Sequence, residues 1–321
     1  MLRYLSFICI TVIILLASSC KKDILHWQQV QKLNSNATCQ LNRIRFVGNN
    51  TCIAAGGVKF DQSVVLRSTD GGYTWAASSY PAAPKGMYGM AVSPNGNIFL
   101  CGVDGDVLHS SDMGESWQFN RVNDWLYYVG IAFPSKDTGI LVNTILQRQC
   151  TITRIDSAFN IIDEQTYLFG LNDIYMVSPT TGYVIGYGTV MKTTNTGATW
   201  SFQDVENDNF MAMDIHGDEI WMCGYNGGVY HTTDGGSHWG RLRNGNDITL
   251  PRYNVLSILF KDELNGWAVC DDGKMIHSDD GGNHWEEYNR FTTNALRSIA
   301  LCPNGDLLVA GDNGSLYRVT P

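Results

Sequence analysis

Three histidines recur at one position of a repeated motif, and imidazole is the commonest protein ligand of metals. His109, His231 and His277 each stand immediately before an octapeptide of the form S/T-x-D-x-G-x-x-W. A metal site needs side chains that converge on one ion, whereas one position of successive repeats places equivalent side chains on separate units. The position is also basic, without being histidine, in other units: Arg67, Lys192 and Arg318. We therefore predict a structural role for these residues and expect no metal and no other cofactor.

Other catalytic patterns are missing from the sequence. It contains no G-x-S-x-G elbow, no H-E-x-x-H motif and no phosphate loop ending in G-K-S/T. Acidic clusters at 103–112 and 207–214 lack the EF-hand spacing and its terminal glutamate, which leaves weak calcium binding through oxygen ligands as an alternative. The role of the chain must therefore be sought in what its repeats build.

The octapeptide occurs five times: STDGGYTW at 68–75, SSDMGESW at 110–117, TTNTGATW at 193–200, TTDGGSHW at 232–239 and SDDGGNHW at 278–285. A side-chain oxygen at its third position can accept backbone N–H bonds within its own turn. Glycine at the fifth position permits positive φ, and the tryptophan can fold back onto the sheet and bury a large area. We therefore predict structural turns rather than catalytic groups at Asp70, Gly72, Trp75, Asp112, Gly114, Trp117, Asn195, Gly197, Trp200, Asp234, Gly236, Trp239, Asp280, Gly282 and Trp285.

The spacing of these octapeptides predicts the fold. Their tryptophans lie about 40 residues apart except for one double gap, which indicates a degenerate copy at 154–162. Each unit has alternating apolar runs separated by turns, which is typical of four short strands. We predict an all-β fold, a seven-bladed β-propeller with four-stranded antiparallel blades. The expected blades are roughly 38–83, 84–124, 125–168, 169–207, 208–250, 251–293 and 294–321.

The last unit contains only three strand patterns, SIALC, LLVAG and SLYRV. The segment ILHWQQV at 24–30 matches the tryptophan-led outer strands of other units, such as SWQFNRV at 116–122. A propeller without its last outer strand would expose open sheet edges. We therefore predict that Trp27–Val30 is the outer strand of the final blade and that Trp27 closes the ring.

The first twenty residues have the pattern of a targeting segment. MLRY carries a positive charge, LSFICITVIILLA is apolar and SSCKK follows. The apolar stretch is short for a membrane span and typical of a signal peptide, and A-S-S-C resembles a bacterial lipoprotein box. We expect a signal peptide at 1–19, lipidation of Cys20, a tether at 20–23 and the propeller at 24–321, at the outer membrane of a bacterial cell envelope. An uncleaved anchor and an ordinary signal peptide are the alternatives.

Composition narrows the class of partner. The formal net charge of −9 disfavours nucleic acid, which selects for basic patches. The 33 glycines and 11% aromatic residues suit short strands and tight turns. Three cysteines, Cys101, Cys223 and Cys270, stand in similar repeat contexts and are expected to be buried thiols. No disulfide between Cys39 and Cys52 is predicted, because a hairpin at residues 48–49 would hold them apart.

The T-T-D-G-G-x-x-W endings, together with the strands GYVI at 182–185 and GWAV at 266–269, carry a family resemblance. The chain resembles the photosystem II stability/assembly factor-like propellers and, more loosely, the Asp-box or BNR-repeat superfamily, over about residues 24–321. Photosynthetic members of that family are assembly chaperones that dock on a membrane protein. The resemblance therefore implies a seven-bladed fold and a non-catalytic, protein-binding role. The family's arginine docking patch has no residue-by-residue match here.

Sialidases also carry the Asp-box, and their resemblance implies a second class of function. Such enzymes hold a carboxylate with an arginine triad whose first member lies in an R-I-P motif, which is absent here. Arg43, Arg252 and Arg297 fall near strand starts in three blades and would have to converge tightly to bind a carboxylate in bidentate fashion. A carbohydrate-binding protein or lapsed hydrolase relative, and an active glycoside hydrolase, are therefore the alternatives to a scaffold.

The mouth of the channel, where connecting loops gather, is the expected binding face. Alignment of the inner strands places seven residues at one level: Asn42, Tyr88, Val129, Asn172, Met211, Leu256 and Arg297. The possible binding residues are Tyr88, Trp125, Tyr127, Asn172, Tyr253, Asn254 and Arg297. Aromatic and amide groups suit protein or glycan contacts, and packing between blades is the alternative. We predict a monomeric lipid-anchored propeller that binds an envelope protein as a scaffold or assembly factor.

Overall fold

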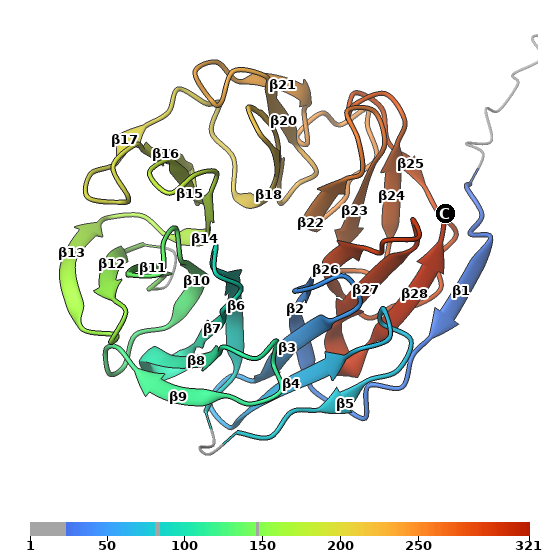
Figure 1. Ribbon diagram of the computed structural model, residues 1–321. Coiled ribbons are helices and arrows are strands. Elements are labelled where there is room, and N and C mark those ends of the chain that lie inside the picture. Colours follow the sequence, from blue (N-terminus) through green and yellow to red (C-terminus); the bar gives the residue numbers. More distant parts are fainter. Residues whose placement is uncertain (1–23, 81–83, 146–147) are drawn as a thin grey trace, which may run out of the picture.

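The computed structural model describes residues 24–80, 84–145 and 148–321. These residues form seven four-stranded antiparallel sheets, arranged around a central axis as the blades of a propeller (Figure 1). Within the described ranges, helical structure is limited to two short 3-10 turns, Val103–Gly105 and Asp312–Gly314. The all-β, seven-bladed fold expected from the repeats is confirmed.

Each blade is a meander of strands from the axis to the rim. The inner strands of blades 1 to 7 are β2 (Gln40–Phe46), β6 (Met87–Val92), β10 (Tyr128–Ala132), β14 (Leu171–Met176), β18 (Phe210–His216), β22 (Val255–Phe260) and β26 (Leu296–Leu301). The second strands are β3 (Cys52–Val58), β7 (Ile98–Gly102), β11 (Thr138–Asn143), β15 (Gly182–Gly186), β19 (Glu219–Gly224), β23 (Gly266–Cys270) and β27 (Leu307–Gly311). The third strands are β4 (Gln62–Ser68), β8 (Asp106–Ser110), β12 (Cys150–Asp156), β16 (Thr189–Thr193), β20 (Val229–Thr232), β24 (Met275–Ser278) and β28 (Leu316–Thr320). The outer strands are β5 (Ala76–Ala77), β9 (Gln118–Arg121), β13 (Ile161–Tyr167), β17 (Ser201–Phe202), β21 (Gly240–Arg243), β25 (Glu286–Glu287) and, in blade 7, β1 (Gln29–Lys32).

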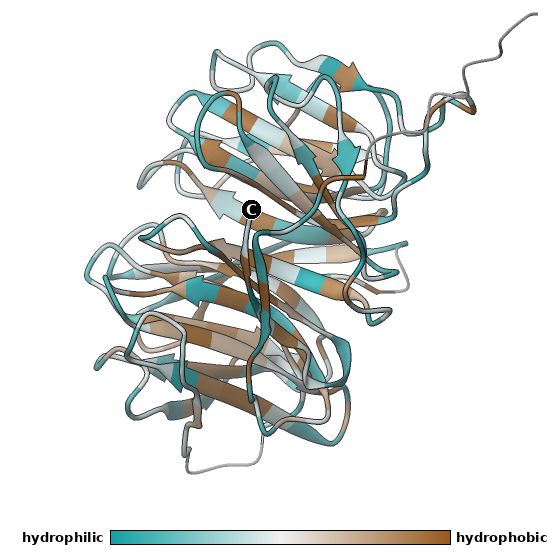
Figure 2. Cartoon of the chain, turned by 90° about the vertical axis from the view of Figure 1, so that its right-hand side faces the viewer, coloured by the Kyte–Doolittle hydropathy of each residue, from teal (hydrophilic) through white to brown (hydrophobic). Residues whose placement is uncertain are grey.

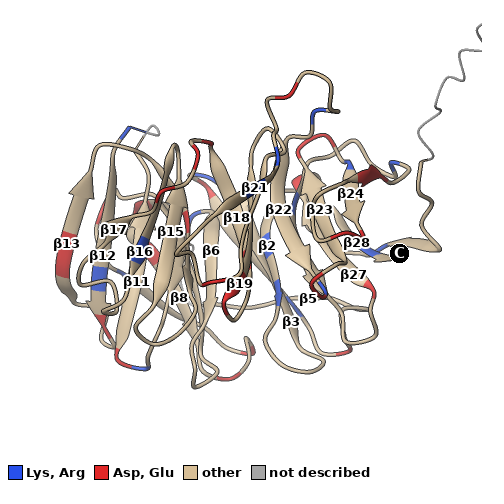
Figure 3. Ribbon diagram, turned by 90° about the horizontal axis from the view of Figure 1, so that it is seen from above, with Lys and Arg blue, Asp and Glu red and all other residues tan. Residues whose placement is uncertain are grey.

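The antiparallel order decides which loops share a face of the disc. The inner strands begin at what we call the upper face, together with the loops between blades and the second-to-third-strand loops. The lower face carries the first-to-second-strand turns and the octapeptide turns between third and outer strands. Charged residues lie mainly in the loops at these two ends, as Figure 3 shows in a side view of the disc.

Hydrophobic packing runs from blade to blade. The second strands β7 and β23 are buried along their whole length, because each lies inside its own sheet and between two neighbouring blades. Phe99 of blade 2 stacks on Phe133 of blade 3 with ring centroids 3.6 Å apart. Hydrophobic residues accordingly follow the strands through the disc, and hydrophilic residues occupy most loops (Figure 2). Each blade contributes one face to the hydrophobic core on either side of it. The ring is therefore stable only when every neighbouring blade is present.

The N-terminal strand completes blade 7, as expected. β1 pairs antiparallel with β28, with Gln29 opposite Thr320 and Gln31 opposite Arg318. Blade 7 therefore has four strands, and its outer edge is covered at the seam of the ring.

The bounds of the strand expected at Trp27–Val30 are wrong by two residues. The strand is Gln29–Lys32, and Trp27 precedes it. Trp27 stacks on Tyr288 at the end of blade 6, with ring centroids 3.6 Å apart, and meets Phe291 edge to face at 6.2 Å. Trp27 therefore packs between blades 6 and 7, just as Trp75, Trp117 and Trp285 pack between the preceding blade and their own.

Blade 3 has no octapeptide turn. A tight turn at 156–160 joins β12 and β13, and the amides of Ala158 and Asn160 both donate to the Asp156 carboxylate at 2.9 Å. The ladder between these two strands is long, from Cys150 opposite Tyr167 to Ile155 opposite Ile161. The degenerate copy therefore lies where the double gap placed it, and a longer ladder replaces the octapeptide turn.

The signal peptide expected at 1–19, the lipidation site Cys20 and the tether at 20–23 lie outside the described residues. In the part of the chain that the structure describes, no helix is long and apolar enough to cross a bilayer. The seven described cysteines are buried free thiols. Burial raises the pKa of the Cys302 thiol to about 11 and of the Cys150 thiol to about 12, so both are protonated and unreactive at neutral pH.

Candidate functional site

The octapeptide turns share one hydrogen-bond pattern. In the first turn, Gly72 N–H donates to the Ser68 hydroxyl at 2.9 Å and Thr74 N–H donates to the Asp70 carboxylate at 2.9 Å. Trp75 Nε1 donates to the Gly72 carbonyl at 3.1 Å. The bonds from the fifth and seventh amides recur in the other four turns, with the Asn195 amide oxygen as the acceptor in blade 4. These side chains are thus engaged inside their own turns.

Side chains of one blade also reach the octapeptide turn of the next blade. Arg67 Nε donates to the carbonyl of Met113, the fourth residue of the turn in blade 2, at 2.9 Å. Trp221 Nε1 in blade 5 donates to Gly281, the fourth residue of the turn in blade 6, at 3.0 Å. The fourth carbonyl is the acceptor in two further junctions: Lys192 to Gly235 and Arg318 to Gly71. This carbonyl is therefore a recurring docking point between blades.

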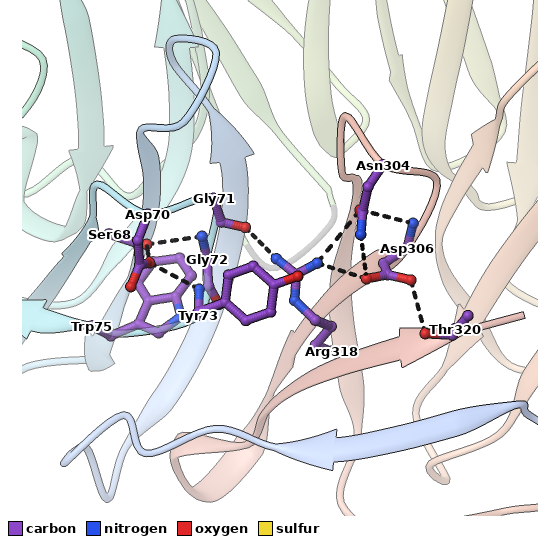
Figure 4. Close-up of polar contacts among 10 residues, drawn as sticks. All are labelled: Ser68, Asp70, Gly71, Gly72, Tyr73, Trp75, Asn304, Asp306, Arg318 and Thr320. Carbon is purple, nitrogen blue, oxygen red and sulfur yellow. Dashed lines mark hydrogen bonds and ion pairs between the residues drawn. The ribbon is translucent and has the colours of Figure 1, made fainter.

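Figure 4 shows the junction between blade 7 and blade 1. Arg318 of β28 donates to the Gly71 carbonyl and forms an ion pair with Asp306 at 2.7 Å. Its guanidinium carbon lies 3.8 Å from the centre of the Tyr73 ring. Asp306 also accepts a hydrogen bond from the Thr320 hydroxyl at 2.8 Å. Because both charged side chains are buried, these bonds together must offset their desolvation.

All seven inner strands carry a register shift at the same level. The residues at the shift are those that the sequence alignment placed together: Asn42, Tyr88, Val129, Asn172, Met211, Leu256 and Arg297. Asn42 Nδ2 donates to the Met87 carbonyl of the next blade at 2.8 Å. Asn172 makes the same bond to Phe210 at 2.7 Å. At this level, bonds of this kind therefore join blade 1 to blade 2 and blade 4 to blade 5.

An ion pair crosses the channel beyond this level. Arg43 of β2 in blade 1 lies 2.7 Å from Asp173 of β14 in blade 4, nitrogen to oxygen. The Tyr175 hydroxyl donates to the same carboxylate at 3.0 Å. Burial, together with the Asp173 carboxylate, raises the pKa of Tyr175 well above its usual value, so the hydroxyl remains a donor. Since blades 1 and 4 face each other across the ring, the pair bridges the channel.

The lower part of the channel widens into a cavity of about 760 Å³. Its wall includes Val92, Phe133 and Leu301 from three inner strands and the turns that follow them, and it also includes Arg45 and Asp214. The Asp214 carboxylate accepts the Phe260 N–H at 2.5 Å. Arg45 is exposed in this wall. The cavity therefore has a mixed wall, in which aliphatic and aromatic side chains alternate with polar groups and Arg45 is an exposed cation.

Large apolar side chains remain exposed in loops of the upper face. Trp125 in the loop between β9 and β10 is 87% exposed, Leu168 between β13 and β14 is 86% exposed, and Ile248 between β21 and β22 is 99% exposed. Phe60 and Tyr187, in second-to-third-strand loops, are also exposed. We call these five residues the upper apolar set. They come from five separate loops on one face.

The residues expected to form a binding face separate into exposed and engaged groups. Trp125 is exposed, whereas Tyr88 and Tyr127 meet edge to face with ring centroids 4.7 Å apart at the channel mouth. Tyr253 is buried, 5.2 Å from the Arg243 guanidinium. The remaining three bind neighbouring groups. Asn172 donates a hydrogen bond to the Phe210 carbonyl, and Asn254 donates one to the Asp271 carboxylate at 3.2 Å. Arg297 forms an ion pair with Asp312. Six of the seven residues expected at the binding face are thus engaged in packing or in polar contacts within the protein.

The three arginines considered for carboxylate binding serve different partners. Arg43 pairs with Asp173 across the channel, and Arg297 pairs with Asp312. Arg252 lies exposed in the loop between β21 and β22. The three guanidinium groups are therefore not directed at one common carboxylate.

Sequence reasoning missed the cross-channel carboxylate and most of the upper apolar set. Asp173 carried a signal, because it is the one charge in the inner strand LNDIYM. Ile248 carried another, because NGNDITLPR is rich in turn formers and yet contains two large aliphatic residues. Leu168 carried no such signal, since its exposure depends on how two blades meet.

Comparison with known proteins adds to this geometry. Residues 156–251 match the family model described as photosynthesis system II assembly factor YCF48. Photosystem II assembly lipoprotein Ycf48 of Synechococcus sp. (strain CC9902) is 32% identical over 103 residues, which cover 29% of this chain and 31% of that protein. Xyloglucanase Xgh74A of Acetivibrio thermocellus is 35% identical over 97 residues, which cover 28% of this chain and 11% of that enzyme. The chain thus spans about a third of the first relative and about a tenth of the second.

Solved structures resemble the chain over most of its length. YCF48 bound to D1 peptide has a TM-score of 0.67 at 17% identity and covers 93% of this chain and 98% of its own. YCF48 from Cyanidioschyzon merolae has a TM-score of 0.67 at 16% identity, covering 91% of this chain and 98% of its own. The propeller domain of Doa1 scores 0.65 at 11% identity, covering 90% of this chain and 94% of its own, so likeness at this level establishes the fold alone. Together with the matched segment, it confirms the resemblance expected from the repeats: the protein is a seven-bladed propeller that is similar to the photosystem II assembly factor-like propellers.

Proposed function

We propose that the protein is a non-catalytic, protein-binding scaffold or assembly factor, held by a lipid on Cys20 in a bacterial cell envelope. The observation that carries this proposal is the upper apolar set. Five large apolar side chains on the loops of one face offer a partner several places at which apolar area can be buried. Aromatic residues such as Trp125 and Phe60 are also the types that contribute most at protein interfaces.

The edge of this surface favours a particular chemistry of partner. Lys59 Nζ lies 5.0 Å from the Phe60 ring centre and 4.8 Å from that of Tyr127. A cation held over aromatic rings at a loop tip can meet a carboxylate at the rim of an interface. The names of the relatives support a protein partner, since one is an assembly lipoprotein and one solved neighbour holds a D1 peptide.

Crosslinking and affinity purification from the native envelope test the scaffold role. The double variant Trp125→Ser, Ile248→Ser should lose its crosslinked partner while keeping the wild-type melting temperature, because both side chains are almost fully exposed. Leu264→Ser is the matched control, since Leu264 is exposed on the lower face. Retention of the partner by the double variant, or hydrolysis of a sugar by the wild type, would contradict the proposal.

A second experiment tests the anchor separately. The variant Cys20→Ala should move from the membrane fraction to the soluble fraction, and a labelled fatty acid should no longer be incorporated. Unchanged fractionation together with unchanged labelling would exclude acylation at this residue and leave the scaffold role to be judged by the upper apolar set.

A further inference from the structure

One junction of the ring lacks the turn that covers the others. In six junctions, the third-to-outer-strand turn of the following blade lies against the preceding blade. Blade 7 takes its outer strand from β1, so no such turn follows β28 in this blade. A groove of about 420 Å³ is found between blades 6 and 7, which we call the seam groove; its lining includes Trp267, His277, Asn304, Gly305 and Thr320.

The neighbouring junction shows what normally fills this place. Between blades 5 and 6, Gly281 is held through both of its backbone groups. Its N–H donates to the Leu264 carbonyl at 2.9 Å, and its carbonyl accepts from Trp221 Nε1 at 3.0 Å. Trp221 lies opposite His231 in the ladder of blade 5. A donor on one blade and an acceptor on the next thus hold a single residue of the turn.

The seam groove contains the same donor. Trp267 lies opposite His277 in blade 6, as Trp221 lies opposite His231 in blade 5. Trp267 is only 5% exposed, and its Nε1 makes no hydrogen bond to any described residue. Burial raises the pKa of the Tyr288 hydroxyl, and the nearby Trp267 indole opposes this rise. The indole N–H and the hydroxyl nevertheless do not reach hydrogen-bond geometry. A buried N–H without an acceptor is costly.

The seam groove contains the matching acceptor as well. Leu264 immediately precedes the residue that closes the first-to-second-strand turn of blade 6, where Lys261 N–H bonds to the Asn265 carbonyl at 2.8 Å. Gly305 has the same place in blade 7, where Cys302 N–H bonds to the Asp306 carbonyl at 2.8 Å. Among the described residues, no group donates to the Gly305 carbonyl.

We propose that the seam groove binds a tight turn of a partner protein through one small residue, whose N–H donates to the Gly305 carbonyl and whose carbonyl accepts from Trp267 Nε1. The inference rests on the scaffold function for the partner being a protein, and it adds a second surface, at the rim. Among the described residues that line the groove, Lys261 is the one lysine or arginine, and neither His277 nor Asp306 presents a free charge. Burial lowers the pKa of His277, which is therefore neutral at neutral pH, and Asp306 is already paired with Arg318.

A peptide copy of the protein's own turn tests the groove directly. The probe is the capped octapeptide SDDGGNHW, the sequence of residues 278–285. Titration of the ¹⁵N-labelled protein should shift the indole N–H signal of Trp267, which is assigned by its loss in Trp267→Phe. That variant should bind the peptide about two- to tenfold more weakly, the effect of one hydrogen bond. Trp125→Phe is the matched control and should bind normally.

A modified probe separates main-chain recognition from general stickiness. Sarcosine at the fourth position of the peptide removes the N–H meant for Gly305 and should also weaken binding. Absence of a saturable shift at millimolar peptide, or equal binding of the sarcosine peptide, would overturn the proposal. A shift that depends on protein concentration without peptide would identify a second copy of the chain as the occupant and overturn it too. Because Trp125→Ser, Ile248→Ser should leave peptide binding intact, failure here is distinguishable from failure of the upper face.

Discussion

The two junctions on either side of blade 7 differ in what fills them. Between blades 7 and 1, Arg318 reaches the turn of blade 1, contacts Tyr73 and pairs with Asp306, as Figure 4 shows. Between blades 6 and 7 there is no turn, and Trp27 stacks on Tyr288 instead. One side of the seam is polar and filled; the other is aromatic and partly open.

The difference shows what a closing strand can and cannot restore. A ladder needs only a backbone of the right direction, and β1 supplies this although it is far from β28 in sequence. A third-to-outer-strand turn needs chain continuity between the two strands, which β28 and β1 do not have. Closure from two ends of the described chain therefore seals the sheet edge and leaves a groove in place of the missing turn.

Removal of β1 should have the largest effect on this comparison, because it opens both sides of the seam. A chain truncated through Gln31 loses the stacking of Trp27 on Tyr288 and most of the ladder to β28. Loss of a buried tryptophan alone costs about 3–5 kcal/mol, which corresponds to a fall in melting temperature of about 5–8 °C, and the truncation should exceed this. Calorimetry measures it, with Trp27→Ala as the intermediate variant. An unchanged melting temperature would mean that β1 does not close the ring.

Breaking the polar side alone should cost less than truncation. Arg318→Met leaves the Asp306 carboxylate buried without its partner, which typically costs about 3–5 kcal/mol. Arg67→Met is the matched control at the equivalent position of blade 1, where the half-buried arginine makes one hydrogen bond to Met113 and about 1 kcal/mol is expected. Urea unfolding gives both values, and Asp306→Asn added to Arg318→Met should recover part of the loss. Equal losses in the two arginine variants would refute the buried-pair account.

The repeats predicted the fold because their signal is local. Asp70 bonds within four residues of itself, so the octapeptide can be read without knowledge of the rest of the chain. The closing strand was predicted because seven blades need an outer strand for each sheet. Its bounds were not predicted: β1 begins two residues after Trp27, whereas β5 and β9 begin directly after their tryptophans. The contacts of Trp27 with Tyr288 and Phe291 form only in the folded ring.

The candidate site was predicted less well than the fold, because its residues are distant in the sequence and meet only in the folded ring. Arg43 and Asp173 are 130 residues apart in the sequence and meet only because the ring places blades 1 and 4 across one channel. Tyr253 was expected at a binding face but is buried in the hydrophobic core between blades 5 and 6. The seam groove is defined by a missing turn and two unpaired backbone or indole groups, which no motif records.

A matched pair of tryptophan variants should sharpen the comparison between a filled and an open junction. Trp221→Phe and Trp267→Phe remove the same volume from equivalent positions. Only the first breaks a hydrogen bond and leaves the Gly281 carbonyl without its donor, so it should cost about 1–2 kcal/mol more than the second. Urea unfolding of both variants measures the difference. Equal losses would mean that Trp267 Nε1 has an acceptor after all.

The smallest effect is expected inside the turn of blade 1 that Arg318 contacts. Burial acts to raise the pKa of Asp70, but hydrogen bonds from Thr74, Ser68 and Tyr73 outweigh it and lower the pKa to about 2. A carboxyl whose pKa is lowered on folding stabilises the protein above its ordinary pKa and loses that contribution as the pH falls through the folded value. Asp70→Asn, which copies the natural Asn195 of blade 4, should therefore be slightly less stable than the wild type at pH 7, and the difference should shrink between about pH 4 and pH 2. Asn195→Asp is the reciprocal control, and it should gain stability at pH 7 and lose the gain over the same range. A pH-independent difference in melting temperature between Asp70→Asn and the wild type would show that the turn depends on the geometry of its acceptor and not on its charge.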